Sequence, residues 1–284
     1  MNVFEKKGAK HIIAQIFIYI ILIFFTFMAL YPLIWLLFSS FKTTQEYQMT
    51  SKLSLIPQVW WWRNYLDAWI RGNFGSLFLN SIFYTGVSTI AILYFSIAAG
   101  FAFAKLPNKT TGFFYKSFVI GVLITLQCIM IPLFFMANWT GLYDTRLGVL
   151  ICYIGIGMPM GIYLTTEFIR SIPTSLVESA RIDGAPYLQI FFDIIFPMSK
   201  PVGITLAILT ITGTWNEFML INILASSEKI KSLPVGVQKF SGALASDYGK
   251  QFAALMISII PIIIFYGIFR KQITKGVAAG AVKG

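Results

Sequence analysis

Charged residues are scarce in this chain. Asp, Glu, Lys and Arg together make up 12% of its 284 residues, about half of the roughly 25% that is usual in a soluble globular domain. Apolar residue types make up 57%, and a soluble fold of this size could not bury that much apolar surface and still cover itself with charge. The composition therefore excludes a soluble protein and indicates a membrane protein.

Residues that usually carry catalysis or bind metals are also few. The chain has one histidine, His11, and two cysteines, Cys128 and Cys152, which lie inside apolar runs without the spacing of a disulfide framework or a metal site. It also lacks a phosphate-binding loop of the form G-x-x-x-x-G-K-[ST], since Lys283 in the glycine-rich tail is followed by Gly284. We therefore expect no catalytic site and no cofactor bound by this chain.

Acidic residues are half as numerous as basic ones, with 11 Asp and Glu against 22 Lys and Arg. No polar segment carries a basic stripe interleaved with aromatic residues, so we do not expect a nucleic-acid partner. In membrane proteins, Lys and Arg instead gather in cytoplasmic loops and contact lipid headgroups. With both termini in the cytoplasm, 13 of the 22 basic residues fall on the inner side, which favours this orientation.

Six apolar runs are long enough to cross a bilayer core of about 30 Å, which needs roughly 20 residues per helix. They cover residues 12–38, 77–104, 113–137, 147–168, 202–225 and 252–269. The first run is too long for a signal peptide and has no small-residue cleavage site after it, so we expect it to be retained. Pro132 and Pro159 are expected to bend their helices.

These runs predict an all-α, polytopic membrane protein with six transmembrane helices. The expected organisation is a cytoplasmic N-terminal tail over residues 1–11, a transmembrane domain over 12–270 and a cytoplasmic C-terminal tail over 271–284.

The polar segment between the fourth and fifth runs, residues 170–200, contains proline and glycine residues that are typical of helix starts and ends. Pro173 suits the start of a short helix, and Gly184 suits the left-handed position that closes one. Pro186 suits the start of a second helix, and Pro197 its end. The first helix would be either a docking element, whose apolar residues Leu176, Val177 and Ala180 fill a groove on a partner, or an amphipathic helix on the inner membrane surface.

This segment resembles the EAA loop of importer-type ABC transporter permeases. Glu178-Ser179-Ala180, three residues, Gly184, nine residues, Ile194, one residue and Phe196-Pro197 reproduce the spacing of the signature Glu-Ala-Ala, Gly, Ile and Leu-Pro. Ser179 replaces Ala and Phe196 replaces Leu. Further segments are similar to maltose-type carbohydrate permeases: Asn64-Tyr65, Asn80-Ser81, Gly141-Leu142, residues 182–185, residues 215–218 and the tail from Gly276.

The resemblance implies an importer-type permease fold in a bacterial cell membrane (inner or plasma membrane) and a function shared among several subunits. The expected partners are a second, homologous permease, two cytoplasmic ATPase subunits that carry ATP and Mg²⁺, and an extracytoplasmic solute-binding protein that delivers a sugar or oligosaccharide. The loop would couple this chain to the ATPase through the following residues: Glu178, Ser179, Ala180, Arg181, Asp183, Gly184 and Pro197.

Glu217 is an acidic residue deep within a run expected to span the membrane. Burying a charge there costs free energy, so an ionisable residue at such a position usually has a function. With Trp215 and Asn216 it offers an aromatic face, an amide and a carboxylate, which suit a sugar pathway. The alternatives are that Glu217 lies near the outer surface or packs against the second permease.

An ion-gradient-driven secondary transporter of a small polar solute is the alternative function. Against it stand the absence of an apparent inverted repeat and the scarcity of buried acids that could couple an ion.

Overall fold

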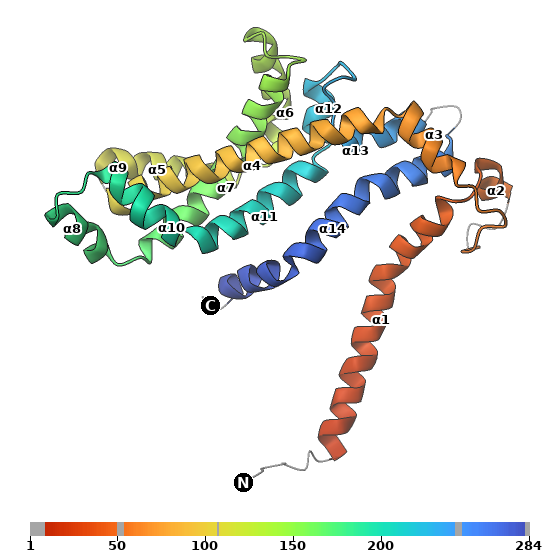
Figure 1. Cartoon of the computed structure of the whole chain (residues 1–284), viewed down its shortest axis with the longest axis horizontal. Helices are drawn as coiled ribbons and strands as arrows, with labels where there is room; N and C mark the ends of the chain where they lie inside the picture. Colours follow the sequence, from red (N-terminus) through yellow and green to blue (C-terminus); the bar gives the residue numbers. More distant parts are fainter. Residues whose placement is uncertain (1–8, 50–53, 107, 242–245, 282–284) are drawn as a thin grey trace. The chain divides into compact units, whose positions relative to one another are not determined.

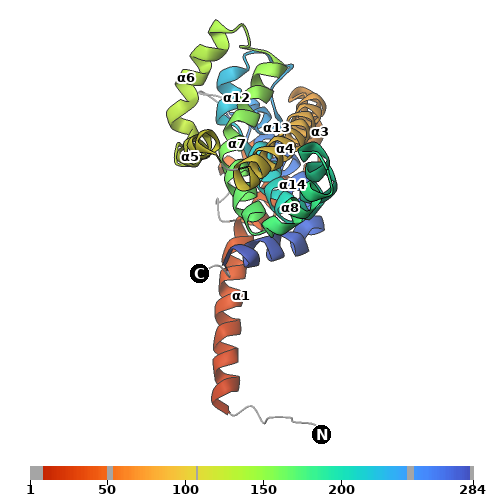
Figure 2. The ribbon, with the colours of Figure 1, turned by 90° about the vertical axis from the view of Figure 1, so that its left-hand side faces the viewer.

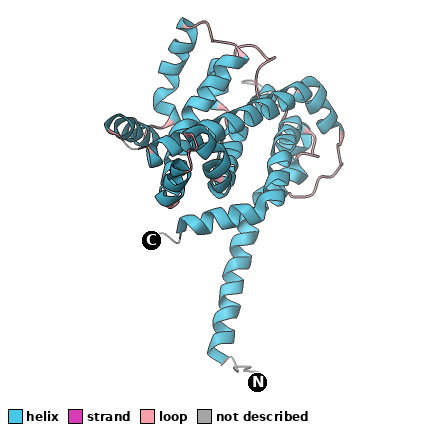
Figure 3. Cartoon of the chain, turned by 60° about the vertical axis from the view of Figure 1, so that its left-hand side comes forward, coloured by secondary structure: helices cyan, strands magenta, loops and turns pink. Residues whose placement is uncertain are grey.

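The computed structural model describes residues 9–49, 54–106, 108–241 and 246–281, and every regular element within them is helical (Figure 3). The predicted all-α class is confirmed. Of the predicted tails, residues 1–8 and 282–284 lie outside the described residues. The chain divides into two compact units, Met1–Gly72 with Lys239–Ile257 and Asn73–Gln238 with Ser258–Gly284, and each is described by itself.

The first unit holds α1 (Ala9–Ser39), α2 (Thr44–Met49), α3 (Arg63–Arg71) and the beginning of α14 (Tyr248–Ala281). Its core is aromatic: the Phe252 ring lies 5.3 Å from that of Trp35 and 5.0 Å from that of Tyr47. The buried Asn64 amide donates to the carbonyls of Ser40 and Lys42 at 2.9 and 2.8 Å. These bonds satisfy backbone acceptors that follow α1 and fix the course of the chain there.

The second unit contains most of the helices. They are α4 (Phe74–Lys105), α5 (Lys109–Val122), α6 (Leu126–Trp139), α7 (Arg146–Arg170), α8 (Thr174–Ile182), α9 (Tyr187–Ile190), the π-helix η1 (Phe191–Ile195), α10 (Phe196–Met198), α11 (Lys200–Asn216), α12 (Met219–Leu224), α13 (Leu233–Gly236) and the later part of α14. A 3-10 turn, η2 (Val237–Phe240), crosses the boundary between the units.

Helix α4 is central to this unit, and it packs along α7 and α11 (Figure 1). Small residues allow α4 and α7 to approach closely. A Cβ atom on Gly100 would lie 2.7 Å from the Thr165 hydroxyl, and one on Gly161 would lie 2.2 Å from the Ser96 hydroxyl. Such contacts between small residues are how membrane helices gain packing energy in the absence of a hydrophobic driving force.

Helices α1, α4, α7 and α14 are long and apolar enough to cross a membrane. Two bent pairs raise the number to six if each pair is one span: residues 110–122 with α6, bent by 110°, and residues 187–198 with α11, bent by 71°. The number of candidate spans in the described residues reaches the expected six when these pairs are counted, although the second pair begins at residue 187, before the expected run over 202–225.

Two expected spans differ from continuous helices. The run over 113–137 is broken between α5 and α6, where Thr125 has an extended backbone, and the run over 202–225 is broken between α11 and α12, where Glu217 is extended. Beyond the breaks, α6 and α12 pack together (Figure 2). They share a core with the buried Tyr84 and Tyr153 rings, whose burial stabilises the broken geometry.

Helix α14 also differs in its length. Its expected span ends at Phe269, whereas the helix continues to Ala281, through most of the segment expected as a tail. Pro132 and Pro159, expected to bend their helices, lie inside α6 and α7. The break in the third run comes before Pro132, at the residues between α5 and α6.

Candidate functional site

The connection between α7 and α11, residues 171–199, begins with the short helix α8. Pro173 is its N-cap, as the sequence predicts, and Gly184 follows its C-cap Asp183 with φ +84°. The Gly184 amide donates to the Arg181 carbonyl at 3.1 Å and the Ala185 amide to the Ala180 carbonyl at 3.0 Å. This pair of bonds is the Schellman arrangement, which favours glycine because other residues are strained in the left-handed region.

The second helix of the connection starts after Pro186, as expected, and continues through α9, η1 and α10 to Met198. Pro197 lies one residue before its end. The chain then turns by 71° into α11. The expected helix–glycine–helix geometry is therefore present, with a π-helical segment that the sequence did not indicate.

The apolar face of α8 packs against its own chain. Val177 is 5% exposed and Ala180 is half-buried, and both contact the cluster formed by Ile97, Ile169 and their neighbours. The expectation that Val177 fills a groove on a partner is therefore wrong, because the core of the second unit already covers it. For Ala180, which is half-buried, docking stays a prediction. Leu176, the third residue of the predicted face, is 41% exposed.

The surface that α8 presents instead combines charge with two strongly exposed apolar residues. Glu178, Ser179 and Asp183 are exposed. Ile182 is 85% exposed and Leu188, after the turn, 69%. Sequence reasoning missed Ile182 and Leu188 because the apolar periodicity of α8 points to Val177 as the partner-facing residue. Their positions on either side of Gly184 were the available signal.

Arg181 is engaged within the connection. Its guanidinium donates to the Ala185 carbonyl at 2.9 Å and lies 4.5 Å from the centre of the Tyr187 ring. These contacts brace the turn at Gly184, since a guanidinium stacks on an aromatic face while it donates in its plane. A hollow of about 330 Å³ lies beside the turn, lined by Ala180, Asp183, Gly184, Ala185, Gln189, Ile190, Asp193 and Ile194.

Glu217 lies at the break between α11 and α12 and is half-buried. Its carboxylate accepts hydrogen bonds from the Leu220 amide at 2.6 Å, the Ile221 amide at 3.1 Å and the Tyr153 hydroxyl at 2.8 Å. The first two bonds satisfy amides that the start of α12 leaves without helical partners. Glu217 is therefore the capping group of a broken span.

The structure separates Trp215 and Asn216 from Glu217. Trp215 is buried, donates from its indole to the Ser258 carbonyl at 3.3 Å and lines a cavity with Pro261 and Phe265. Asn216 is exposed and donates to the Thr212 carbonyl of its own helix. Glu217 lines a different cavity, of about 270 Å³. The expected trio does not converge on one cavity.

The cavity beside Glu217 is lined by groups from α4, α6, α7, α11 and α12. Its polar members are Tyr153, Thr210, Thr214 and Glu217. Leu126, the first residue of α6, and Leu220 of α12 also line it. Both helix breaks are therefore adjacent to this cavity.

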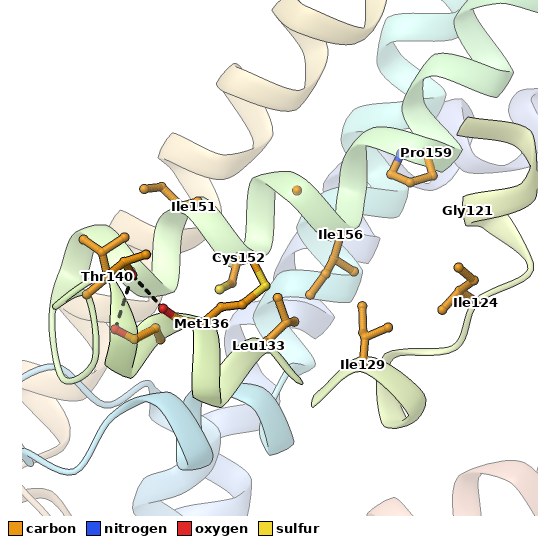
Figure 4. A pocket seen from close by; sticks show the side chains of 14 residues that line it. Gly121, Ile124, Ile129, Leu133, Met136, Thr140, Ile151, Cys152, Ile156 and Pro159 are labelled. Atoms are coloured by element: carbon orange, nitrogen blue, oxygen red, sulfur yellow. Dashed lines mark hydrogen bonds between the residues drawn. The ribbon is translucent and has the colours of Figure 1, made fainter. Parts of the chain in front are cut away.

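A larger cavity, of about 510 Å³, lies between α6, α7 and the break that follows α5 (Figure 4). Its lining is aliphatic, with Ile124, Leu133 and Ile156 pointing into it. Thr140, at one end, directs its hydroxyl to the Met136 carbonyl at 2.8 Å. Sugar sites need polar partners and stacking faces, and the described lining of this cavity offers few of the former and no aromatic ring.

A network that sequence reasoning missed holds the loop between α12 and α13. The Asn80 amide donates to the carbonyls of Lys229 and Lys231 at 2.8 and 3.0 Å, and its carbonyl accepts from Arg146 at 3.0 Å. The Tyr84 hydroxyl donates to the Ile230 carbonyl at 2.7 Å. The signals were the polar residue Asn80 within an apolar run and the resemblance of Asn80-Ser81, but its partners are too distant in sequence to predict.

Comparisons with known proteins agree with this architecture. Residues 96–278 match the model of the family described as binding-protein-dependent transport system inner membrane component. The chain is 32% identical over 284 residues to the probable ABC transporter permease protein YurM of Bacillus subtilis, which covers 100% of this chain and 94% of that protein. It is 34% identical over 269 residues to the multiple sugar-binding transport system permease protein MsmG of Streptococcus mutans, covering 93% and 96%.

A solved structure is also similar. It is a bacterial ABC transporter involved in the import of the acidic polysaccharide alginate, and one of its chains superposes with a TM-score of 0.81 at 27% identity. The match covers 94% of this chain and 99% of that one. The likeness extends over both units described above.

Proposed function

The chain belongs to the family of binding-protein-dependent transport system inner membrane components, and from this premise we propose that it is the permease subunit of an ATP-driven importer of sugars or oligosaccharides. It works with a second, homologous permease, two cytoplasmic ATPase subunits and an extracytoplasmic solute-binding protein. ATP and Mg²⁺ bind to the ATPase subunits, and this chain carries no hydrolytic site of its own. Its location is a bacterial inner membrane.

The observation that carries the proposal is the exposed turn at Gly184. The turn is held by its two backbone bonds and by Arg181, so its shape is fixed before any partner binds. Ile182 and Leu188 offer apolar anchors on either side, while Glu178 and Asp183 add charge. An exposed apolar pair rimmed by charged residues is typical of a docking surface.

The docking residues of this surface are those of the EAA-like segment. Glu178, Ser179 and Asp183 contact the ATPase directly, whereas Ala180, Arg181 and Gly184 fix the shape of the turn. Pro197 is positioned just before the 71° turn into α11, where the movement of the connection passes to a membrane helix. In this proposal the connection and both termini lie on the cytoplasmic side, where the ATPase subunits are.

The class of substrate is supported by the names of relatives. Besides the multiple sugar-binding system, a protein of Thermoanaerobacterium thermosulfurigenes that is 33% identical over 253 residues is named as a probable starch degradation products permease. The cavity beside Glu217 supplies hydroxyls from Thr210 and Thr214 and the Tyr153 ring, which suit a sugar. Asn216 remains a candidate contact because it is exposed, whereas Trp215 and Glu217 act on this pathway through helix packing and capping.

Transport by the reconstituted complex tests this function. The chain is co-purified with a second permease, an ATPase and a binding protein, placed in liposomes and supplied with a panel of labelled mono- and oligosaccharides. We expect uptake of at least one sugar that requires both ATP and the binding protein. Gly184→Val is expected to abolish uptake while the complex still assembles, because valine is strained at a φ of +84°.

The matched control for that variant is Gly112→Val. Gly112 lies in α5, and a Cβ atom there meets nothing within 4 Å. Normal uptake by Gly184→Val would contradict the coupling role of the turn. Uptake by the chain alone, driven by an ion gradient and abolished by an ionophore, would instead establish a secondary transporter.

A further inference from the structure

Lys105 is the last residue of α4, and its side chain reaches the start of α8. The ammonium group donates to the Ile172 carbonyl at 2.5 Å and to the Thr174 hydroxyl at 3.3 Å. Ile172 belongs to the short link between α7 and α8, and Thr174 is the first residue of α8. One side chain therefore connects the end of a membrane-spanning helix to the entrance of the short helix.

Few other polar contacts fix the start of α8. Its N-cap, Pro173, makes no side-chain capping hydrogen bond, and the Ile172 carbonyl is one of the acceptors in the link that precedes the helix. A charged donor on such a carbonyl forms a stronger bond than a neutral one. Lys105 therefore supplies a polar attachment at a helix start that lacks a side-chain cap.

Apolar contacts at the same place reinforce this attachment. Ile172 is 5% exposed and belongs to the buried cluster that includes Ile97 and Phe101 of α4. Val177, the one buried residue of α8, joins the same cluster. The start of α8 is thus held in an apolar cluster that α4, α7 and the second helix of the connection share, and the Lys105 ammonium adds a polar link from α4 to the first residue of α8.

Helix α4 is suited to transmit a displacement of α8 to the membrane-spanning helices. It packs against α5, α7, α11 and α13, so a shift of its end moves most of the second unit. From this geometry we infer that Lys105 is a positioning residue: it holds α8 on the end of α4 so that movement of the ATPase-docking turn is transmitted to the membrane helices. The inference rests on the proposed function, in which the turn at Gly184 docks on the ATPase.

The test uses the reconstituted complex in liposomes and three variants. Lys105→Met keeps the apolar stem and removes the donor, Lys105→Arg keeps a charged donor, and Lys116→Met is the matched control at an exposed lysine of α5. Three quantities are measured: ATP hydrolysis without binding protein, its stimulation by sugar-loaded binding protein, and sugar imported per ATP hydrolysed.

We expect Lys105→Met to lower sugar imported per ATP about tenfold, the size of effect expected when one charge-assisted hydrogen bond is lost, with assembly and unstimulated hydrolysis unchanged. Lys105→Arg should keep most of the sugar imported per ATP hydrolysed, and Lys116→Met should leave this quantity unchanged. If Lys105 had a merely structural role, Lys105→Met would lower the amount of assembled complex but leave the sugar imported per ATP by that complex unchanged.

Two outcomes overturn the inference. One is a normal ratio of import to hydrolysis in Lys105→Met, and the other is failure of that variant to assemble, since a positioning residue is dispensable for folding. The Gly184→Val variant, measured in parallel, separates the two proposals. If Gly184→Val is inactive and Lys105→Met is normal, the coupling role of the turn stands and only the role of Lys105 fails. Normal transport by Gly184→Val contradicts the coupling role of the turn in the proposed function.

Discussion

The Tyr153 hydroxyl of α7 donates a hydrogen bond of 2.8 Å to the Glu217 carboxylate, which also caps the first amides of α12. The bond joins an uninterrupted membrane-spanning helix to the break in another. Tyr153 is 6% exposed, and a buried hydroxyl of this kind requires a partner. Glu217, an acidic residue within an apolar run, is thus part of the framework around a cavity.

Replacement of Glu217 by alanine is expected to destabilise the second unit by about 2 kcal/mol or more, because charge-assisted hydrogen bonds are each worth about 1.5–3 kcal/mol and buried donors lose their acceptor. Tyr153→Phe removes one donor and leaves the cap intact, so its effect should be smaller. Thermal unfolding of the detergent-solubilised protein measures the loss of stability in both variants. A changed sugar preference in Glu217→Ala, with an unchanged melting temperature, would show that Glu217 contacts substrate instead.

Gly100 and Gly86 of α4 form a matched pair. A Cβ atom on Gly100 would lie 2.7 Å from the Thr165 hydroxyl and 3.0 Å from the Thr166 amide nitrogen, whereas one on Gly86 meets nothing within 4 Å. Gly100→Ala should therefore destabilise the protein by about 1–3 kcal/mol through overpacking.

The other member of the pair, Gly86→Ala, should leave stability unchanged or raise it by up to about 1 kcal/mol, through helix propensity. Melting temperatures of both variants provide the measurement. Equal effects at the two sites would contradict the close packing of α4 on α7.

Asn80 ties the loop between α12 and α13 to α4 and Arg146. Asn80→Ala removes both carbonyl contacts, so the loop should open locally and its lysines, Lys229 and Lys231, should become more accessible. Limited trypsin digestion should show faster cleavage at these two lysines, by about tenfold for a loss of 1.4 kcal/mol in local stability.

Asn138→Ala is the control for this experiment, because the exposed Asn138 amide donates only within α6, to the Phe134 carbonyl at 3.0 Å. Equal cleavage rates in the two variants would show that Asn80 does not hold the loop.

Acid should weaken the first unit through Asp247. Burial raises the pKa of this carboxyl, but hydrogen bonds from Lys250 and Thr44 outweigh it and hold the pKa below its ordinary value of 3.8. The contribution of Asp247 to stability is therefore present above pH 3.8 and is lost as the pH falls through the lower, folded-state pKa.

Asp247→Asn should lower the melting temperature at neutral pH and reduce its decline between pH 5 and pH 3 (roughly the range in which carboxylates titrate). Thermal unfolding over this pH range is the measurement. A decline as steep as in the unchanged protein would assign the acid sensitivity to other carboxyls.

Local features of this protein could be predicted from the sequence, and long-range ones could not. Pro173 and Gly184 bound α8 as predicted, because proline and glycine act on the backbone of their own neighbours. The break at Glu217 is different: Asn216 and Glu217 interrupt the apolar run without indicating that the helix ends there, and one of the bonds that stabilise the break comes from Tyr153, 64 residues away. The same holds for Val177, which is buried in a cluster with residues of α4, α7 and η1.

Helix α4 has 32 residues, which at 1.5 Å per residue makes a rod of about 48 Å. The hydrocarbon core of a bilayer is about 30 Å thick, so roughly 18 Å of this rod stands outside it even when the helix is upright. Its two ends carry the polar attachments, Asn80 near one and Lys105 at the other. The two attachments are 25 residues apart, about 38 Å along the helix, so a displacement at one of them is carried across the bilayer core to the other by a single helix.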